Sequence, residues 1–282
     1  MKRGAKELVV TADDFGAALE VNEAVERAHR EGILSAASLI VTAPAATDAV
    51  RRAARMPRLR VGVHLVLIDG PAALPARRLP DLTGDDGRLR ADRVGYGGKL
   101  LLSRSARSQL AQEIAAQFAL FRATGLTLDH VDAHQHFHLH PLIGREVVRQ
   151  AAANGARFVR VPREPWRVLK RLEVHPPGAR ALLAPFARLL ARRVSGAGLR
   201  TPDQVFGLAW SGAMTSDRLV GLIGHLPQGL TEIYTHPATG GAFAGAAAGY
   251  RYSEELAALI APEVIEAARI SGARLGGFSD FL

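Results

Sequence analysis

Residues 8–14 read LVVTADD, an apolar run that ends in two adjacent carboxylates. Short runs of β-branched and apolar residues are typical of buried strands, so we predict a strand over Leu8–Ala12. Asp13 and Asp14 then follow the carboxyl end of that strand. The same order, an apolar strand followed by polar side chains, recurs further along the chain, and it decides the fold that we predict.

The rest of the chain alternates short apolar runs with helical patterns. About seven strands separated mostly by helices predict an α/β protein with a parallel sheet and helices outside it. The other strands are predicted over Ser38–Val41, Leu59–Leu67, Thr127–Val131, Arg157–Val161, Thr231–Thr235 and Arg274–Phe278. The helices are predicted over Glu20–Glu31, Thr47–Arg55, Ala106–Thr124, Leu142–Asn154, Asp217–Leu226 and Glu254–Ile270.

Ionisable side chains lie at the carboxyl ends of five of these strands. They are Asp13 and Asp14, His64, the run Asp132–His140, Arg160 and His236. In a (β/α) barrel the carboxyl ends of the strands form one rim, and the active site is built there. We therefore predict a closed or nearly closed barrel in preference to an open doubly wound sheet.

A metal site is indicated by the kinds of side chain at this rim. The sequence has no cysteine, so histidines and carboxylates must hold any ion. Four histidines stand at alternate positions in residues 134–140, and at most two of them would contact one ion. With Asp14 and His64, they supply one carboxylate and two imidazoles and leave positions open for water and substrate. Zn²⁺, Co²⁺, Ni²⁺ and Fe²⁺ suit this set, and Mg²⁺ fits with several waters bound.

The other polar residues at the rim suit hydrolysis. A divalent ion lowers the pKa of a bound water and polarises a carbonyl oxygen. With Asp14 as a ligand, Asp13 is the candidate general base, and His236 can protonate a departing amine from across the rim. Arg160 could orient Asp13, hold an oxyanion or form a structural salt bridge, and the sequence leaves these three roles open.

Four segments, in this order along the chain, resemble the motifs of the YdjC/ChbG carbohydrate deacetylases. They are TADDFG (residues 11–16), GVHL (62–65), HVDAHQH (130–136) and YTHP (234–237), and the likeness extends to GFSD at 277–280. The resemblance implies an irregular (β/α) barrel related to the polysaccharide deacetylases, which removes acetyl groups from N-acetylated amino sugars. It also implies one divalent metal ion on Asp14, His64 and His134, a base at Asp13 and an acid at His236.

Within that family, the chain is most similar to the hopanoid biosynthesis-associated branch, HpnK. The segments that carry this likeness are VTADDFG (10–16), HLVLIDG (64–70) and VRVPREP (159–165). It implies removal of the acetyl group from an N-acetylglucosaminyl hopanoid, which leaves a glucosaminyl lipid.

Two segments are expected to modify one deacetylase domain that covers residues 1–282. Residues 69–98 are rich in Pro, Gly and Asp and too long for a simple connection, so we expect a lid loop over the site. Residues 163–200 form a basic helical insertion with nine basic and two acidic residues, and they carry +7 of the net charge of +9. A concentrated basic surface favours an anionic partner.

A cationic amphipathic helix is indicated within that insertion. In residues 181–194, Leu182, Leu183, Phe186, Leu189, Leu190 and Val194 alternate with arginines. Such a helix can lie in a membrane interface, which would make residues 178–194 a peripheral membrane contact. Alternatively it packs on the barrel with a solvated basic face, and Pro185 interrupts it. Nucleic acid is not an expected partner, because only Trp166 and Phe186 are aromatic there and no binding motif is present.

Other functions remain open from the sequence alone. A deacetylase of soluble chito-oligosaccharides would need no amphipathic patch near the mouth of the site. A metal-dependent phosphoesterase usually needs a richer ligand set for two ions, and a metal store would leave Asp13 and His236 without a role. The N-terminus lacks a signal-peptide pattern and no apolar run of membrane-spanning length occurs, so we expect a cytoplasmic protein, with contact to the inner membrane as an option. The oligomeric state is open, a homodimer included.

Overall fold

A single sheet organises the computed structural model, which describes residues 5–172 and 180–282. Its strands pair in the order β5-β4-β3-β2-β1-β7-β6, with β8 added beside β1, and every pairing is parallel. The bounds are β1 Lys6–Phe15, β2 Ala36–Leu39, β3 Arg60–Leu65, β4 Leu128–Ala133, β5 Phe158–Val159, β6 Gln204–Phe206, β7 Gly229–Thr235 and β8 Arg274–Leu275.

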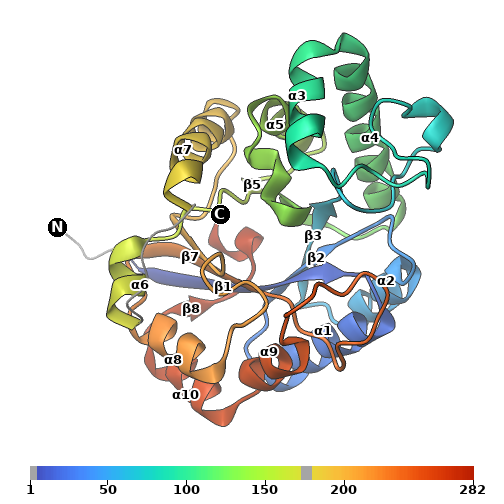
Figure 1. Ribbon diagram of the computed structural model, residues 1–282. Coiled ribbons are helices and arrows are strands. Elements are labelled where there is room, and N and C mark those ends of the chain that lie inside the picture. Colours follow the sequence, from blue (N-terminus) through green and yellow to red (C-terminus); the bar gives the residue numbers. More distant parts are fainter. Residues whose placement is uncertain (1–4, 173–179) are drawn as a thin grey trace.

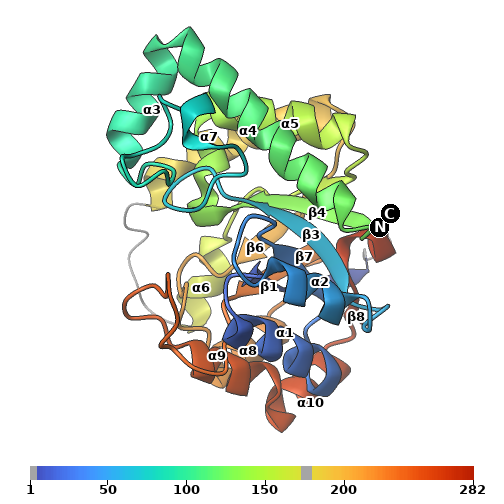
Figure 2. The ribbon, with the colours of Figure 1, turned by 90° about the vertical axis from the view of Figure 1, so that its right-hand side faces the viewer.

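The sheet curves into an incomplete barrel (Figure 2). Backbone hydrogen bonds link its two end strands, β5 and β6, through neighbouring residues. The residues after β5 bond to β6, and the residues before β6 bond to β5. Val205 N donates a hydrogen bond to Arg163 O at 2.9 Å, and Val159 N donates one to Arg200 O at 3.0 Å. The predicted α/β fold, an irregular barrel of about seven parallel strands, is thereby confirmed.

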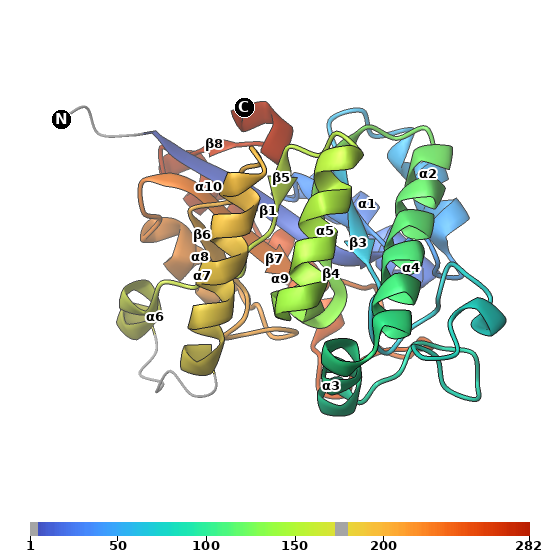
Figure 3. The ribbon, with the colours of Figure 1, turned by 90° about the horizontal axis from the view of Figure 1, so that it is seen from above.

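Helices cover the sheet on opposite sides (Figure 1). One apolar stripe packs inward in each; in α5, Ile143, Val147 and Ala151 are buried at helical spacing. The helices α4, α5 and α7 lie side by side over one side of the sheet (Figure 3), and α1, α8, α9 and α10 lie on the other. The bounds are α1 Leu19–Glu31, α2 Ala46–Ala53, α3 Arg93–Leu102, α4 Arg104–Ala123, α5 Pro141–Ala153, α6 Trp166–Leu172, α7 Arg180–Gly196, α8 Ser216–Gly224, α9 Tyr252–Leu259 and α10 Pro262–Ile270.

Several elements differ from those predicted, among them the helix α3, which begins inside the segment predicted as a loop. Strand β6 was not predicted, because a strand of three residues is too short to show a periodic pattern. The helix predicted over Glu254–Ile270 is two helices, since Pro262 occupies the first turn of α10. A residue before proline is driven out of the helical region, and Ala261 accordingly has ψ 133°.

Residues 69–98, predicted as a lid loop, contain regular structure and lie against α4. The segment includes a 3-10 turn at Ala76–Arg78 and the first residues of α3. Buried Glu113 of α4 accepts hydrogen bonds from Ala73 N at 2.7 Å and Leu74 N at 3.0 Å. Whether the segment opens and closes as a lid stays a prediction.

The basic insertion contributes α6 and α7, which lie on either side of residues 173–179. Pro185 lies inside α7 without ending it. Of the proposed membrane contact over residues 178–194, positions 178 and 179 fall outside the described residues. Among the residues that are described, no helix combines the length and apolar character needed to span a bilayer.

Candidate metal centre and catalytic cleft

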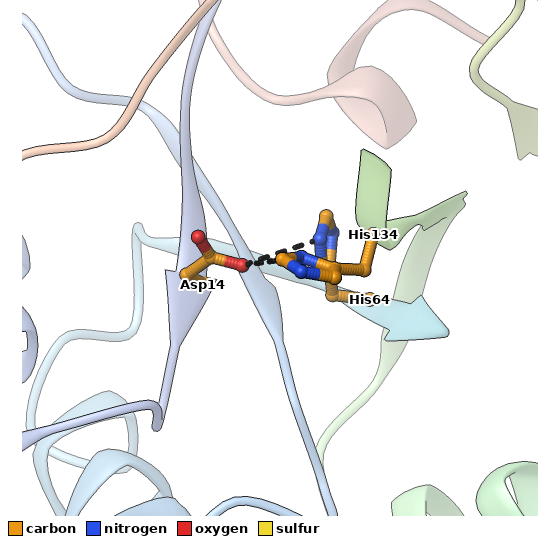
Figure 4. Close-up of side chains that lie close together, drawn as sticks. All are labelled: Asp14, His64 and His134. Carbon is orange, nitrogen blue, oxygen red and sulfur yellow. Dashed lines mark hydrogen bonds and ion pairs between the residues drawn. The ribbon is translucent and has the colours of Figure 1, made fainter. Parts of the chain in front are cut away.

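Asp14, His64 and His134 come from three different elements and converge on one point (Figure 4). The Asp14 carboxylate oxygen Oδ1 lies 3.4 Å from His64 Nε2 and 3.2 Å from His134 Nδ1. Metal–ligand bonds of about 2.0–2.2 Å place neighbouring ligand atoms roughly 3.0–3.4 Å apart at octahedral or tetrahedral angles. The spacing and the donor types therefore fit a single divalent ion.

A bulge in β1 brings both Asp13 and Asp14 to this site. Successive residues of a regular strand face opposite sides, which would separate two adjacent carboxylates. The register of β1 against β2 shifts between Ala12 and Phe15, and Asp14 adopts φ 61°. A left-handed conformation costs roughly 1–2 kcal/mol in a residue other than glycine, so it is tolerated only where the surroundings enforce it.

His64 is oriented by a fully buried carboxylate, Asp132. His64 Nδ1 donates to Asp132 Oδ1 at 2.8 Å, which directs Nε2 toward Asp14. Asp132 also accepts from Ser38 Oγ at 2.7 Å. Burial would raise the pKa of Asp132, but the charges of Arg160 and His64 hold it well below the usual value. Burial would likewise lower the pKa of His64, yet Asp132 raises it to about 9, so a metal ion at Nε2 would compete with a proton.

Arg160 lies inside the barrel, with no exposed surface, among three carboxylates. Its Nη1 and Nη2 bond to Asp13 at 2.6 and 2.7 Å. Nη1 also lies 2.8 Å from Asp132, and Nε and Nη2 donate to Glu232 at 2.8 and 2.5 Å. Four of these contacts are hydrogen bonds, and the one to Asp132 is an ion pair. The sequence indicated no role for Glu232 or Asp132, because the contacts join strands that are far apart along the chain.

His236 reaches the cleft from the end of β7. Its backbone N–H donates to the carboxylate of Glu255, a buried residue of α9 that also accepts from Met214 N at 2.8 Å. Its ring lies 5.0 Å from that of Tyr250 between centroids. Nδ1 of His236 has no hydrogen-bond partner within the described part of the chain. The backbone hydrogen bond and the ring packing therefore hold this imidazole in the wall of the cleft.

Of the four clustered histidines, only His134 belongs to the group with Asp14 and His64. The run is not a strand but a 3-10 turn in which Gln135 and His136 both have φ 52°, so alternate residues do not share a face. His136 Nε2 lies 3.0 Å from Tyr234 Oη, and His138 Nε2 lies 2.8 Å from Arg160 O. Burial lowers the pKa of His138 to about 4, so this ring is neutral near pH 7. His140 immediately precedes α5.

These side chains lie in a cleft of about 960 Å³. Its polar part contains Asp13, Asp14, His64, His134 and His236. Its apolar part includes Leu183 and Phe186 of α7 and Val94 of α3, so both the basic insertion and the segment predicted as a lid contribute to the walls.

Residues 7–269 match the sequence profile of the family described as "YdjC-like protein". The chain belongs to the YdjC-like family. This confirms the family resemblance of the four motifs, whereas likeness to the hopanoid-associated branch stays a prediction. A carbohydrate deacetylase from Geobacillus stearothermophilus is 30% identical over 276 residues, which cover 97% of each chain. One from Homo sapiens is 30% identical over 84% of this chain and 76% of its own.

Two further proteins resemble this YdjC-like chain, one in part of its sequence and one in its fold. A carbohydrate deacetylase from Brevibacillus brevis is 38% identical over 160 residues, which span 56% of this chain and 59% of that one. A solved structure from Enterococcus faecalis V583, described as a candidate cellobiose-phosphate cleavage protein, superposes with a TM-score of 0.79 over 98% of this chain and 99% of its own. At 21% identity this second likeness shows the fold alone.

Proposed function

We propose that this YdjC-like protein is a metal-dependent N-deacetylase of an amino sugar, the group being the N-acetylglucosaminyl unit of a hopanoid lipid. Carbohydrate deacetylase is the activity named for the relatives that align along most of the chain. The observation that carries the proposal is the placement of Asp13, a metal-type ligand set and His236 around one cleft.

Asp14, His64 and His134 would hold the ion. A divalent ion there supplies a water of lowered pKa and polarises the acetyl carbonyl oxygen. Burial would raise the pKa of Asp14, but His134 and His64 hold it below the usual value, so the carboxylate is ionised and able to bind a cation. The zinc or magnesium identity of the ion is open to direct measurement.

Asp13 is the proposed base and His236 the proposed acid. Two hydrogen bonds from Arg160 fix the Asp13 carboxylate in one orientation. Asp13 would take a proton from the attacking water, and the imidazole of His236 would give one to the departing amine. Arg160 acts here as a positioning residue, because its guanidinium is fully buried and already donates to Asp13 and Glu232.

A two-metal phosphoesterase is disfavoured by the same contacts. A second group of ligand type exists, made of Asp13, His64 and Asp132. The guanidinium of Arg160 already contacts both of those carboxylates, and Asp132 also holds His64 Nδ1. A second ion would have to displace a buried cation, so one metal fits this site better than two.

An acetate-release assay distinguishes a hopanoid substrate from a soluble chito-oligosaccharide. Purified protein with and without Zn²⁺ or Mg²⁺ is incubated with an N-acetylglucosaminyl hopanoid and, separately, with chitobiose. The proposal expects metal-dependent release from the hopanoid. Release from chitobiose alone would keep the deacetylase chemistry and replace the lipid by a soluble chito-oligosaccharide. Release from neither would contradict the deacetylase function.

A further inference from the structure

A second cavity opens between α6 and α7. Its volume is about 450 Å³, within the range of small-molecule sites. Its apolar walls come from Trp166 and Leu169 on α6, Leu183, Ala184 and Ala187 on α7, and Leu208. Two arginines and two carboxylates also line it, so their formal charges cancel. Such a lining suits an uncharged hydrocarbon better than an ionic ligand.

This cavity adjoins the catalytic cleft. Leu183 and Leu208 line both hollows. Leu183 is 40% exposed and its neighbour Phe186, in the cleft, is 42% exposed. Large apolar side chains that are exposed to solvent inside a cavity are typical of a ligand-binding site, because a bound ligand would bury them.

The chemistry of an amino sugar links the two hollows. In an N-acetylated hexosamine, the carbon that bears the acetamido group is bonded to the carbon that bears the aglycone. When the acetamido group reaches Asp14, His64 and His134, the aglycone must therefore leave the sugar inside the same cleft. Leu183 and Leu208 line both hollows, so an aglycone that leaves the sugar beside them would lie next to the second cavity.

We propose that the α6–α7 cavity is the binding site for an apolar aglycone of the substrate. The inference rests on the proposed deacetylase function and adds a place where the hydrocarbon part is recognised. At about 30 Å³ for each water-sized group, 450 Å³ has room for roughly fifteen carbon atoms, so the cavity would hold one part of a hopanoid and not the whole hydrocarbon. The aglycone would thus contribute to binding through burial rather than through hydrogen bonds.

Two simple glycosides test this site. Methyl and octyl N-acetyl-β-glucosaminide share the reacting sugar and differ only in alkyl length, and both are used below the micellar concentration of the octyl compound. We expect kcat/KM for acetate release to be at least about tenfold higher for the octyl glycoside, since burial of two methylene groups already supplies about that factor. Equal values for the two glycosides would overturn the proposal.

A variant that fills the cavity locates the effect. Ala184 lines the second cavity and is not among the residues that line the cleft. We expect Ala184→Trp to bring the octyl-to-methyl ratio of kcat/KM close to one. Ser195→Trp is the matched control, because Ser195 lies exposed near the end of the same helix, and it should keep the ratio of the wild type. A ratio that Ala184→Trp leaves unchanged would contradict the assignment.

Calorimetric binding of the same two glycosides separates this inference from the proposed function. The assay with the hopanoid and chitobiose decides the deacetylase function, whereas tighter binding of the octyl compound that Ala184→Trp abolishes supports an apolar site whether or not acetate is released. Equal binding of both compounds, with weaker attachment of Ala184→Trp to anionic vesicles, would make the cavity a membrane contact and overturn the aglycone assignment.

Discussion

At the scale of single residues, Asp13 and Asp14 show how neighbours in sequence acquire different surroundings. Asp13 is 2% exposed and bound to Arg160, whereas the side chain of Asp14 is 22% exposed and faces two imidazoles. The bulge at this point of β1 is what separates their environments. Two carboxylates of the same type can therefore carry two different proposed roles, base and ligand.

Substitution of each carboxylate should separate those roles. We expect Asp14→Ala to lose stoichiometric metal, because one of three ligands is removed. Asp13→Asn should keep the metal and lower kcat by a factor of about 10²–10⁴, the usual contribution of a general base. Metal content by elemental analysis, measured beside turnover, checks both. Equal loss of metal in the two variants would overturn the division of roles.

Asp132 gives a second prediction at this scale. Because its carboxylate holds His64 Nδ1, Asp132→Asn should weaken metal binding by about 10–100-fold. Asp129→Asn is the matched control, since Asp129 is also a buried acid of β4 and holds a different histidine, His130. Metal dissociation constants from competition with a chromophoric chelator check the difference. Comparable weakening in both variants would mean that the effect is general destabilisation of β4.

At the scale of elements, the segment at 69–92 depends on α4 for its position. Glu113 and Gln117 of α4 bind backbone groups of residues 66, 73 and 74, although that helix lies later in the chain. These contacts bring Asp69 and Arg88 to the cleft. The segment is therefore held at residues 73 and 74, and any lid motion would have to occur in the other residues of the segment.

Replacing one anchor should loosen the segment. In Glu113→Gln, one carboxylate oxygen becomes an N–H donor facing a backbone N–H, which leaves a donor unpaired at a cost of about 1–3 kcal/mol. We expect faster hydrogen exchange over residues 73–82 with little change in α5. Gln112→Ala is the control. Gln112 also lies on α4, and this change removes only an exposed hydrogen bond from Arg78. Unchanged exchange in Glu113→Gln would show that the buried leucines of the segment suffice to hold it.

At the scale of the whole molecule, the fold does not depend on the metal in the way that small zinc domains do. The sheet and its helices bury a continuous apolar core that runs from β1 to α10. Inside the barrel, the guanidinium of Arg160 already pairs with three buried carboxylates, and these ion pairs need no metal ion. Metal binding should thus add to stability rather than create the fold.

Removal of the metal tests that expectation. At an ion concentration of about 100 Kd, binding to the folded state adds about 2.7 kcal/mol to the free energy of unfolding. We expect excess chelator to lower Tm by several degrees and to leave the far-ultraviolet circular dichroism spectrum unchanged at 25 °C. Loss of secondary structure on chelation would contradict an independently stable barrel. Asp14→Ala should show the lower Tm with or without chelator.

The sequence by itself determined the alternation of strands and helices and the placement of the polar side chains. Parallel strands bring their carboxyl ends to one rim, so Asp14, His64 and residues 132–140 could be expected to meet without knowledge of their contacts. The same reasoning missed β6 and the break before α10, because a three-residue strand has no period and helical periodicity continues across Pro262.

Only the tertiary structure decided which partners meet at the site. The left-handed turn at Gln135 and His136 leaves His134 alone of its cluster beside Asp14, and no spacing rule reveals that turn. Arg160 contacts Asp13 and Glu232, which lie 147 and 72 positions away, so local patterns carry no trace of the network. The apolar cavity likewise exists only where α6 and α7 pack beside the cleft. Local chemistry depends on neighbours in sequence, whereas a site depends on neighbours in space.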